Sequence, residues 1–163
     1  MTTSKEGVEK IDYVVKQWIE KGELELAIET AKLGASTKTI DHLVKACISK
    51  KLPYEEVKKR IWERGTWSPY AFLHTALDAA KLGASREVID SLVKIYVKEK
   101  EFLLAGLAAK LGASKEIREF LVEACIKQNW RFEENKLGIR AILVGGRNLT
   151  VEEIKKTKTL ILE

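Results

Sequence analysis

The side chains able to do chemistry are few, and their spacing fits structural roles better than catalytic ones. The chain has two histidines and two cysteines. His74 precedes Asp78 by one helical turn, but a metal site needs further ligands than this pair. Neither cysteine belongs to a Cys-x-x-Cys pair or lies near a histidine, which argues against zinc. We therefore expect no metal centre and no cofactor.

Nucleophilic and phosphate chemistry lack their usual patterns as well. A catalytic Ser or Cys needs an activating base, and no Gly-x-Ser-x-Gly occurs. The run Gly145-Gly146-Arg147-Asn148 could offer amides and a cation to phosphate, but it lacks the Gly-Lys-Ser/Thr ending of a P-loop, so a turn is favoured. Paired glutamates (Glu55/Glu56, Glu133/Glu134, Glu152/Glu153) fall in first turns of expected helices, where they complement the helix dipole. We predict no catalytic residue and no enzyme activity.

The elements that position these residues are set by a repeated hexapeptide. Ala-Lys-Leu-Gly-Ala-Ser occupies residues 31–36, 80–85 and 109–114. In each copy the glycine suits the end of one helix and the serine the N-cap of the next. The hexapeptide therefore predicts the turn between two antiparallel helices.

A longer similarity contains two of these copies. Residues 8–61 can be laid on residues 86–139 without a gap, which matches Asp12 with Asp90 and Cys47 with Cys125. We predict an all-α fold, with tandem-duplicated multi-helix units forming a short α-solenoid or a pseudo-twofold helical bundle. One domain is expected over 1–163, with units over 8–65 and 86–143, a connection over 66–85 and a tail over 144–163.

Apolar periodicity and capping residues predict the individual helices. They cover residues 5–21, 23–33, 36–51, 53–64, 69–82, 85–99, 101–111, 114–128, 131–143 and 150–160. For the tail the alternative is a hairpin or strand pair, using the β-formers of 139–144 and 159–162. Cys47 and Cys125 follow apolar helix stripes, so we expect buried free thiols, with a disulfide as the alternative.

The run Leu73-His74-x-Ala76, with Ala79-Ala80-Lys81-Leu82-Gly83 after it, resembles the helix-turn-helix of ankyrin repeats. The Thr-Pro-Leu-His signature is absent, and the spacing of the copies is uneven. The broader resemblance is to α-hairpin repeat proteins, namely the tetratricopeptide, HEAT and armadillo classes. This resemblance implies an interaction scaffold and supplies no site residues.

Composition narrows the class of protein further. The chain is 45% hydrophobic and 33% charged, with a net charge of +5. These values favour a soluble globular protein, and no apolar run reaches the roughly 20 residues of a membrane span. The N-terminus does not resemble a signal peptide, so we expect a cytoplasmic protein without membrane contact. The scarcity of Gln and Asn beside abundant Lys and Glu is typical of thermophilic proteins.

Aromatic and basic residues gather between the two units, where the function is predicted to lie. Trp62 aligns with Arg140, so packing shared by both units does not explain it. The tryptophans could cover the seam between the units, bind a protein, or stack on nucleic-acid bases. We predict a non-enzymatic scaffold that binds a protein partner or a second copy of itself, using Lys58, Lys59, Arg60, Trp62, Arg64 and Trp67. The alternative is nucleic-acid binding through the same patch and the basic residues Arg131, Lys136, Arg140 and Arg147.

Overall fold

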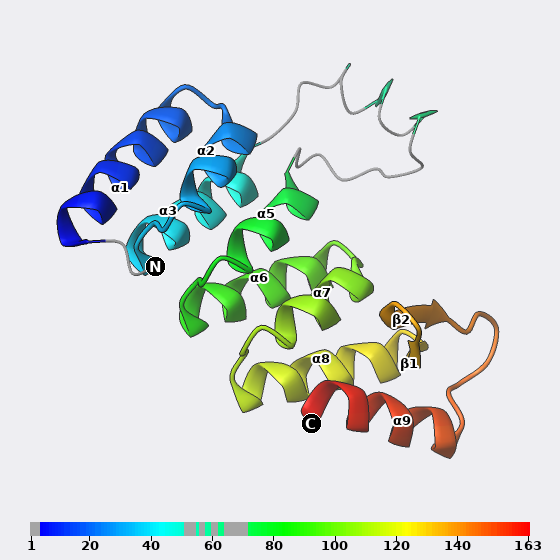
Figure 1. Cartoon of the computed structure of the whole chain (residues 1–163). Coiled ribbons are helices and arrows are strands. Elements are labelled where there is room, and N and C mark those ends of the chain that lie inside the picture. The colour runs from blue at the N-terminus through cyan, green and yellow to red at the C-terminus, as the bar shows by residue number, and fades with distance from the viewer. Residues whose placement is uncertain (1–3, 51–54, 56–57, 60–61, 64–71) are drawn as a thin grey trace. The chain divides into compact units, whose positions relative to one another are not determined.

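The computed structural model describes residues 4–50, 55, 58–59, 62–63 and 72–163, and it divides the chain into two compact units, Met1–Val88 and Ile89–Glu163. Within the described part, eight helices accompany one small sheet (Figure 1). No helix there is long and apolar enough to cross a bilayer. The elements are α1 (Lys5–Glu20), α2 (Leu24–Ala31), α3 (Thr37–Ser49), α5 (Leu73–Ala80), α6 (Arg86–Lys98), α7 (Phe102–Ala109), α8 (Lys115–Lys127), β1 (Trp130–Asn135), β2 (Gly138–Leu143) and α9 (Val151–Leu162).

The three hexapeptides end one helix and begin the next, as predicted. The helices before the turns end at Ala31, Ala80 and Ala109. The turn glycines have φ angles of +123°, +122° and +119°, in a region that side chains with a Cβ rarely adopt. The serine hydroxyls then cap the next helices by accepting the backbone N–H three residues on.

A carboxylate from an earlier helix holds each of these turns. Asp12 of α1 accepts the Ser36 N–H at 2.9 Å and the Ser36 hydroxyl at 2.6 Å. Because the N–H of an N-cap residue lies outside the helical ladder, this carboxylate satisfies a donor that the turn leaves open. The same backbone bond, at 2.8 Å, joins Asp41 to Ser85 and Asp90 to Ser114.

The core of the first unit lies between α1, α2, α3 and α5. Its inner residues have no exposed surface and come from the apolar stripes that the sequence predicts, among them Val15, Ala27, Leu43 and Cys47. Each fully buried aliphatic side chain contributes roughly 1.5–3 kcal/mol. At one edge the ammonium group of Lys50 donates to the Gly22 carbonyl at 2.8 Å and lies 4.7 Å from the ring centre of Phe72.

The second unit closes with a hairpin and a helix. Strands β1 and β2 pair antiparallel, with Phe132 opposite Ala141, and α9 packs against β1. Thr157 of α9 is fully buried, and its hydroxyl accepts the Phe132 N–H at 3.0 Å. The Phe102 and Trp130 rings stack with centroids 5.1 Å apart, which joins α7 to the start of β1.

The predicted helix over 131–143 is wrong, and so is the strictly all-α class, because β1 and β2 occupy this stretch. Asn129 has a φ of +59°, which turns the chain away from the helical path at the end of α8. Strands then place Phe132 and Ile139 toward the core, while the charged residues beside them remain accessible. The hairpin alternative placed a strand correctly at 139–144, but residues 159–162 belong to α9 rather than to a second strand.

Candidate functional site

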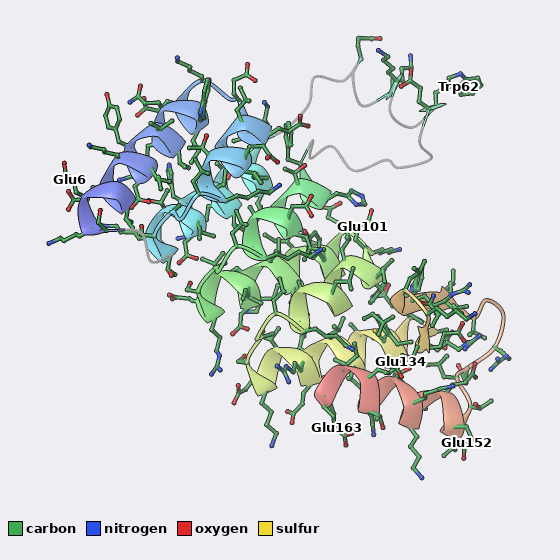
Figure 2. All side chains as sticks on the ribbon, in the orientation of Figure 1. Glu6, Trp62, Glu101, Glu134, Glu152 and Glu163 are labelled. Atoms are coloured by element: carbon green, nitrogen blue, oxygen red, sulfur yellow. The ribbon has the colours of Figure 1, made fainter. Side chains whose placement is uncertain are left out.

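The segment predicted to bind a partner is described only in part. Lys58, Lys59 and Trp62 are exposed, and Trp62 has 90% of its surface accessible (Figure 2). Arg60, Arg64 and Trp67 lie outside the described residues.

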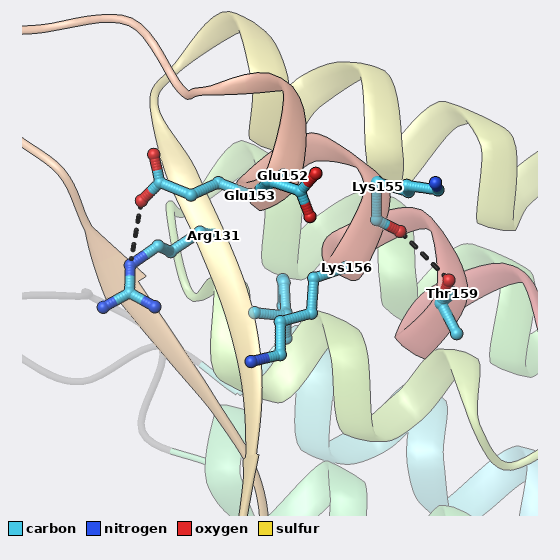
Figure 3. A pocket seen from close by; sticks show the side chains of 7 residues that line it. Arg131, Glu152, Glu153, Lys155, Lys156 and Thr159 are labelled. Atoms are coloured by element: carbon cyan, nitrogen blue, oxygen red, sulfur yellow. Dashed lines mark hydrogen bonds and ion pairs between the residues drawn. The ribbon is translucent and has the colours of Figure 1, made fainter.

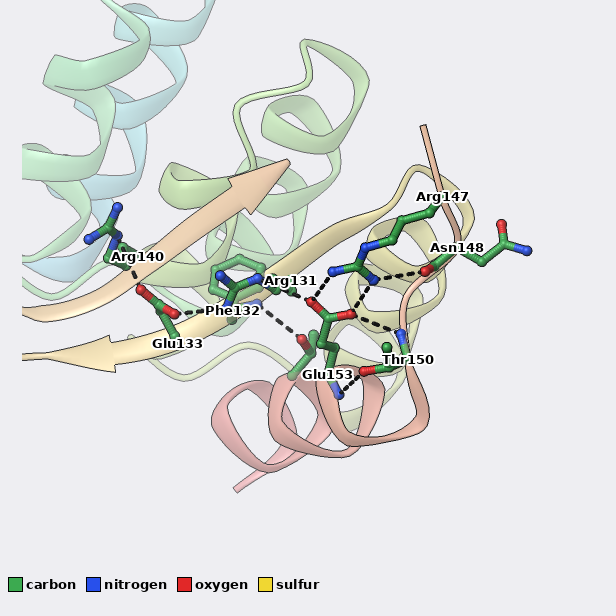
Figure 4. Close-up of polar contacts among 9 residues, drawn as sticks. Arg131, Phe132, Glu133, Arg140, Arg147, Asn148, Thr150 and Glu153 are labelled. Atoms are coloured by element: carbon green, nitrogen blue, oxygen red, sulfur yellow. Dashed lines mark hydrogen bonds and ion pairs between the residues drawn. The ribbon is translucent and has the colours of Figure 1, made fainter. Parts of the chain in front are cut away.

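The basic residues predicted near the C-terminus form an ion-pair network with two glutamates (Figure 4). Arg131 bonds to Glu133 at 2.7 Å and pairs with Glu153 at 3.3 Å. Arg147 holds both carboxylate oxygens of Glu153, at 2.6 and 3.1 Å, and Arg140 lies 3.5 Å from Glu133. Lys136 is exposed in the turn between the strands. The structure therefore brings the three arginines together, but around carboxylates that offset their charge.

The network shifts the titration of its members. The Arg147 hydrogen bond, with help from the Thr150 N–H, lowers the pKa of Glu153 to about 2. The Arg131 hydrogen bond lowers the pKa of Glu133, and the bond to Glu153 raises the pKa of Arg147. Both glutamates are thus charged at neutral pH, because the arginines favour their ionised form. Glu153 also lies in the first turn of α9, where negative charge is favourable.

A cavity of about 520 Å³ lies beside this network, between β1 and residues 152–159 of α9 (Figure 3). Lys155, Lys156 and Thr159 line it together with Arg131 and Glu153. Figure 3 shows the Glu153 carboxylate turned toward the Arg131 guanidinium, so the arginine that lines the cavity is already engaged in an ion pair. Lys155 and Lys156 are exposed, and Phe132, which is almost fully buried, also borders the cavity.

A larger groove of about 750 Å³ lies in the first unit, where α2 and α5 contact each other. The sequence did not indicate it, because its two walls are separated by some forty residues and meet only in the fold. Apolar groups in the lining include Leu26, Ile28 and Leu82. Its charged residues are the carboxylates Glu23, Glu25, Glu29 and Asp78 and the lysines Lys32 and Lys81.

The corresponding face of α7 in the second unit is covered. Strand β2 packs on α7, and a Cβ built on Gly106 would lie 2.5 Å from Cε1 of Phe132 and 3.2 Å from Cδ1 of Ile139. The fifth residue of α7 is thus glycine because the hairpin occupies the space of a side chain. At the fifth position of α2 and α5 stand Ile28 and Leu77.

The histidines and cysteines are not assembled into a reactive site. His42 and His74 are exposed. Cys47 and Cys125 are fully buried, as predicted, and burial raises the pKa of each thiol to about 12, so neither is a thiolate at neutral pH. Among the described residues, no group of three or more His, Cys, Asp or Glu side chains could hold a metal ion.

Comparison of the chain with protein-family models, with curated proteins and with solved structures gives no match.

Proposed function

We propose that this chain is a non-enzymatic helical-repeat scaffold that binds a protein partner through the segment containing Lys58, Lys59 and Trp62. The observation that carries the proposal is the 90% exposure of Trp62. Tryptophan buries roughly 150–250 Å² when covered and is enriched among residues that dominate binding energy. The exposed indole of Trp62 therefore supports a protein-binding hot spot in this segment.

Recurring helix lengths and turns support the scaffold proposal. Helices α2, α5 and α7 each have 8 residues, and α3, α6 and α8 after them each have 13. The same glycine turn joins each pair, and an Asp–Ser bond anchors it. We infer a tandem origin for these pairs and a solenoid-like stacking, an architecture whose extended faces bind other proteins.

The test is affinity capture from an extract of the source organism, with Trp62→Ala compared with wild type. We expect partner recovery to fall about tenfold, equivalent to about 1.4 kcal/mol of binding. The free energy of unfolding should change by less than about 0.5 kcal/mol, because the side chain makes little contact with the fold. Leu137→Ala is the matched control, since Leu137 is 99% exposed but lies in the hairpin turn. Equal recovery with both variants, or a large loss of stability in Trp62→Ala, would contradict the proposal.

Nucleic-acid binding is the second candidate, favoured by the accessible lysines beside Trp62, which can neutralise phosphates next to a stacked base. The ion pairs of Arg131, Arg140 and Arg147 weaken its second half, the basic C-terminal region. Filter binding of single-stranded RNA and DNA at low salt tests it. A nucleic-acid binder would give a signal that falls steeply as salt rises, whereas no signal at low salt would remove this candidate.

A further inference from the structure

We infer that the groove between α2 and α5 is a second binding surface, and that its occupant is a segment of a partner protein that places Lys or Arg side chains beside an apolar one. The groove belongs to the first unit and includes none of the residues of the segment around Trp62. The two surfaces can therefore be tested separately.

The charges of the groove select a basic occupant. Four carboxylates face two lysines, so the lining is negative on a chain whose net charge is +5. Lys32 is already engaged by Glu29 at 2.7 Å, whereas Glu23 and Glu25 form no ion pair with any of the described residues. A partner cation would meet accessible carboxylates, and complementary charge of this kind guides association and fixes the register of a bound segment.

The apolar residues of the groove indicate that the occupant also carries an apolar side chain. Leu26 is 45% exposed, although it belongs to an eight-residue helix whose neighbouring positions Ala27 and Ile28 are buried. Covering Leu26 and Leu82 would remove apolar surface from water at about 25 cal/mol per Å². The volume of about 750 Å³ lies within the range of sites that hold small ligands or a few side chains.

The covered face of α7 shows how the same helix position accommodates an occupant. There the sixth residue is Leu107, half-buried, and the occupant is the apolar face of the hairpin, which presents Phe132 and Ile139 beside the fifth residue, Gly106. In α2 and α5 the sixth residues are Glu29 and Asp78, both exposed. An occupant with only an apolar face would leave these carboxylates without partners, so the face that enters the open groove must carry cations.

Fluorescence anisotropy with a labelled peptide of alternating Lys and Leu tests the inference, with a Glu–Leu peptide and a Lys–Ser peptide as probes of charge and apolar content. We expect the Lys–Leu peptide to bind more tightly than either. The double variant Glu25→Lys/Asp78→Lys should weaken its binding about tenfold, because two favourable charge contacts become repulsive. Glu9→Lys, an exposed reversal on α1 outside the groove, should leave it unchanged.

Three outcomes would overturn the inference. These are no binding of the Lys–Leu peptide at low salt, equal binding by Glu25→Lys/Asp78→Lys and Glu9→Lys, and equal binding of the Lys–Leu and Glu–Leu peptides. Gel filtration provides a fourth such outcome. If the wild-type chain is a dimer and Glu25→Lys/Asp78→Lys is a monomer, the occupant of the groove is a second copy of the chain. Trp62→Ala should not alter peptide binding, so failure of this inference and failure of the proposed function are distinguishable.

Discussion

Helices α2 and α7 have the same length and similar flanking residues, but one borders an open groove and the other is covered. Both have 8 residues, follow a glutamate and lead into Lys-Leu-Gly-Ala-Ser. Helix α2 shows glutamates at its second and sixth positions and borders an open groove, whereas α7 has Leu103 and Leu107 there and lies beneath the hairpin. The turn residues thus determine how the helices connect, and the residues between the turns determine which face stays open.

The difference also separates two uses of charge. In the second unit, Glu133 pairs with Arg131 and Arg140 within the hairpin. Glu153 of α9 pairs with Arg131 of β1 and with Arg147, which joins the hairpin to α9. In the groove, Glu25 has no such partner among the described residues. Carboxylates with intramolecular cations serve the fold, and carboxylates without them remain available to a partner.

The largest expected effect comes from emptying the covered face. Phe132→Ala should lower the free energy of unfolding by about 3–5 kcal/mol, because the ring is 1% exposed and fills the space over Gly106. Leu26→Ala is the matched truncation in the open groove and should cost less than about 1 kcal/mol, since nearly half of that side chain is exposed. Urea denaturation gives both values, and hydrogen exchange of α7 and of α2 assigns each loss to its unit. Similar losses in the two variants would contradict the distinction between covered and open faces.

How much of this comparison the sequence could predict depends on the range of the interactions. The glycine turns and serine caps follow from local residue types, so the hexapeptides predict correctly where α2, α5 and α7 end and where α3, α6 and α8 begin. The helix expected over 53–64 lies mostly outside the described residues. The alignment of 131–139 with 53–61 predicts a helix there, whereas β1 pairs with β2 and β2 packs on α7. These are tertiary contacts that a local alignment does not contain. The sequence does carry a signal in α7 itself. This helix is apolar all round over residues 102–107, which predicts burial on more than one side.

The sequence contains weaker indications of the groove and of the Asp–Ser hydrogen bonds than of the helix caps. Asp12, Asp41 and Asp90 each follow an isoleucine on the helical stripe, a recurrence that marks a shared role but does not name the acceptor's partner. Each bond joins residues at least 24 positions apart, so only the fold brings the pair together. Residue types predict the local helix caps, whereas tertiary packing determines which serine each Asp binds and which helix faces stay exposed.

A smaller effect is expected from Gly106→Ala, which tests why this position differs from Ile28 and Leu77. The added methyl overlaps the Phe132 ring, and relieving the overlap should cost about 1–3 kcal/mol, partly offset by the better helix propensity of alanine. Gly145→Ala is the control, because nothing lies within 4 Å of its added Cβ. Combining Gly106→Ala with Phe132→Leu removes the overlapping ring atoms, so the double variant should lose less than the sum of the two single losses, as urea denaturation can measure. Additive losses would show that the hairpin does not dictate the glycine.

The smallest expected effect is a pH dependence of the free energy of unfolding that arises from Glu153 in the second unit. Because the folded pKa of Glu153 is about 2, below its usual 4.5, the folded state binds this proton more weakly than the unfolded state does. The stabilisation is therefore fully present above about pH 4.5 and is lost as pH falls toward 2. Urea denaturation of wild type and Glu153→Gln across this range should show a stability difference that shrinks with falling pH. Glu25→Gln removes a groove carboxylate with no partner among the described residues, so any trend that it shares reflects net charge. A gap between wild type and Glu153→Gln that stays constant down to pH 2 would mean that the arginines do not hold this carboxylate, and the contrast between the paired and the open carboxylates would fail with it.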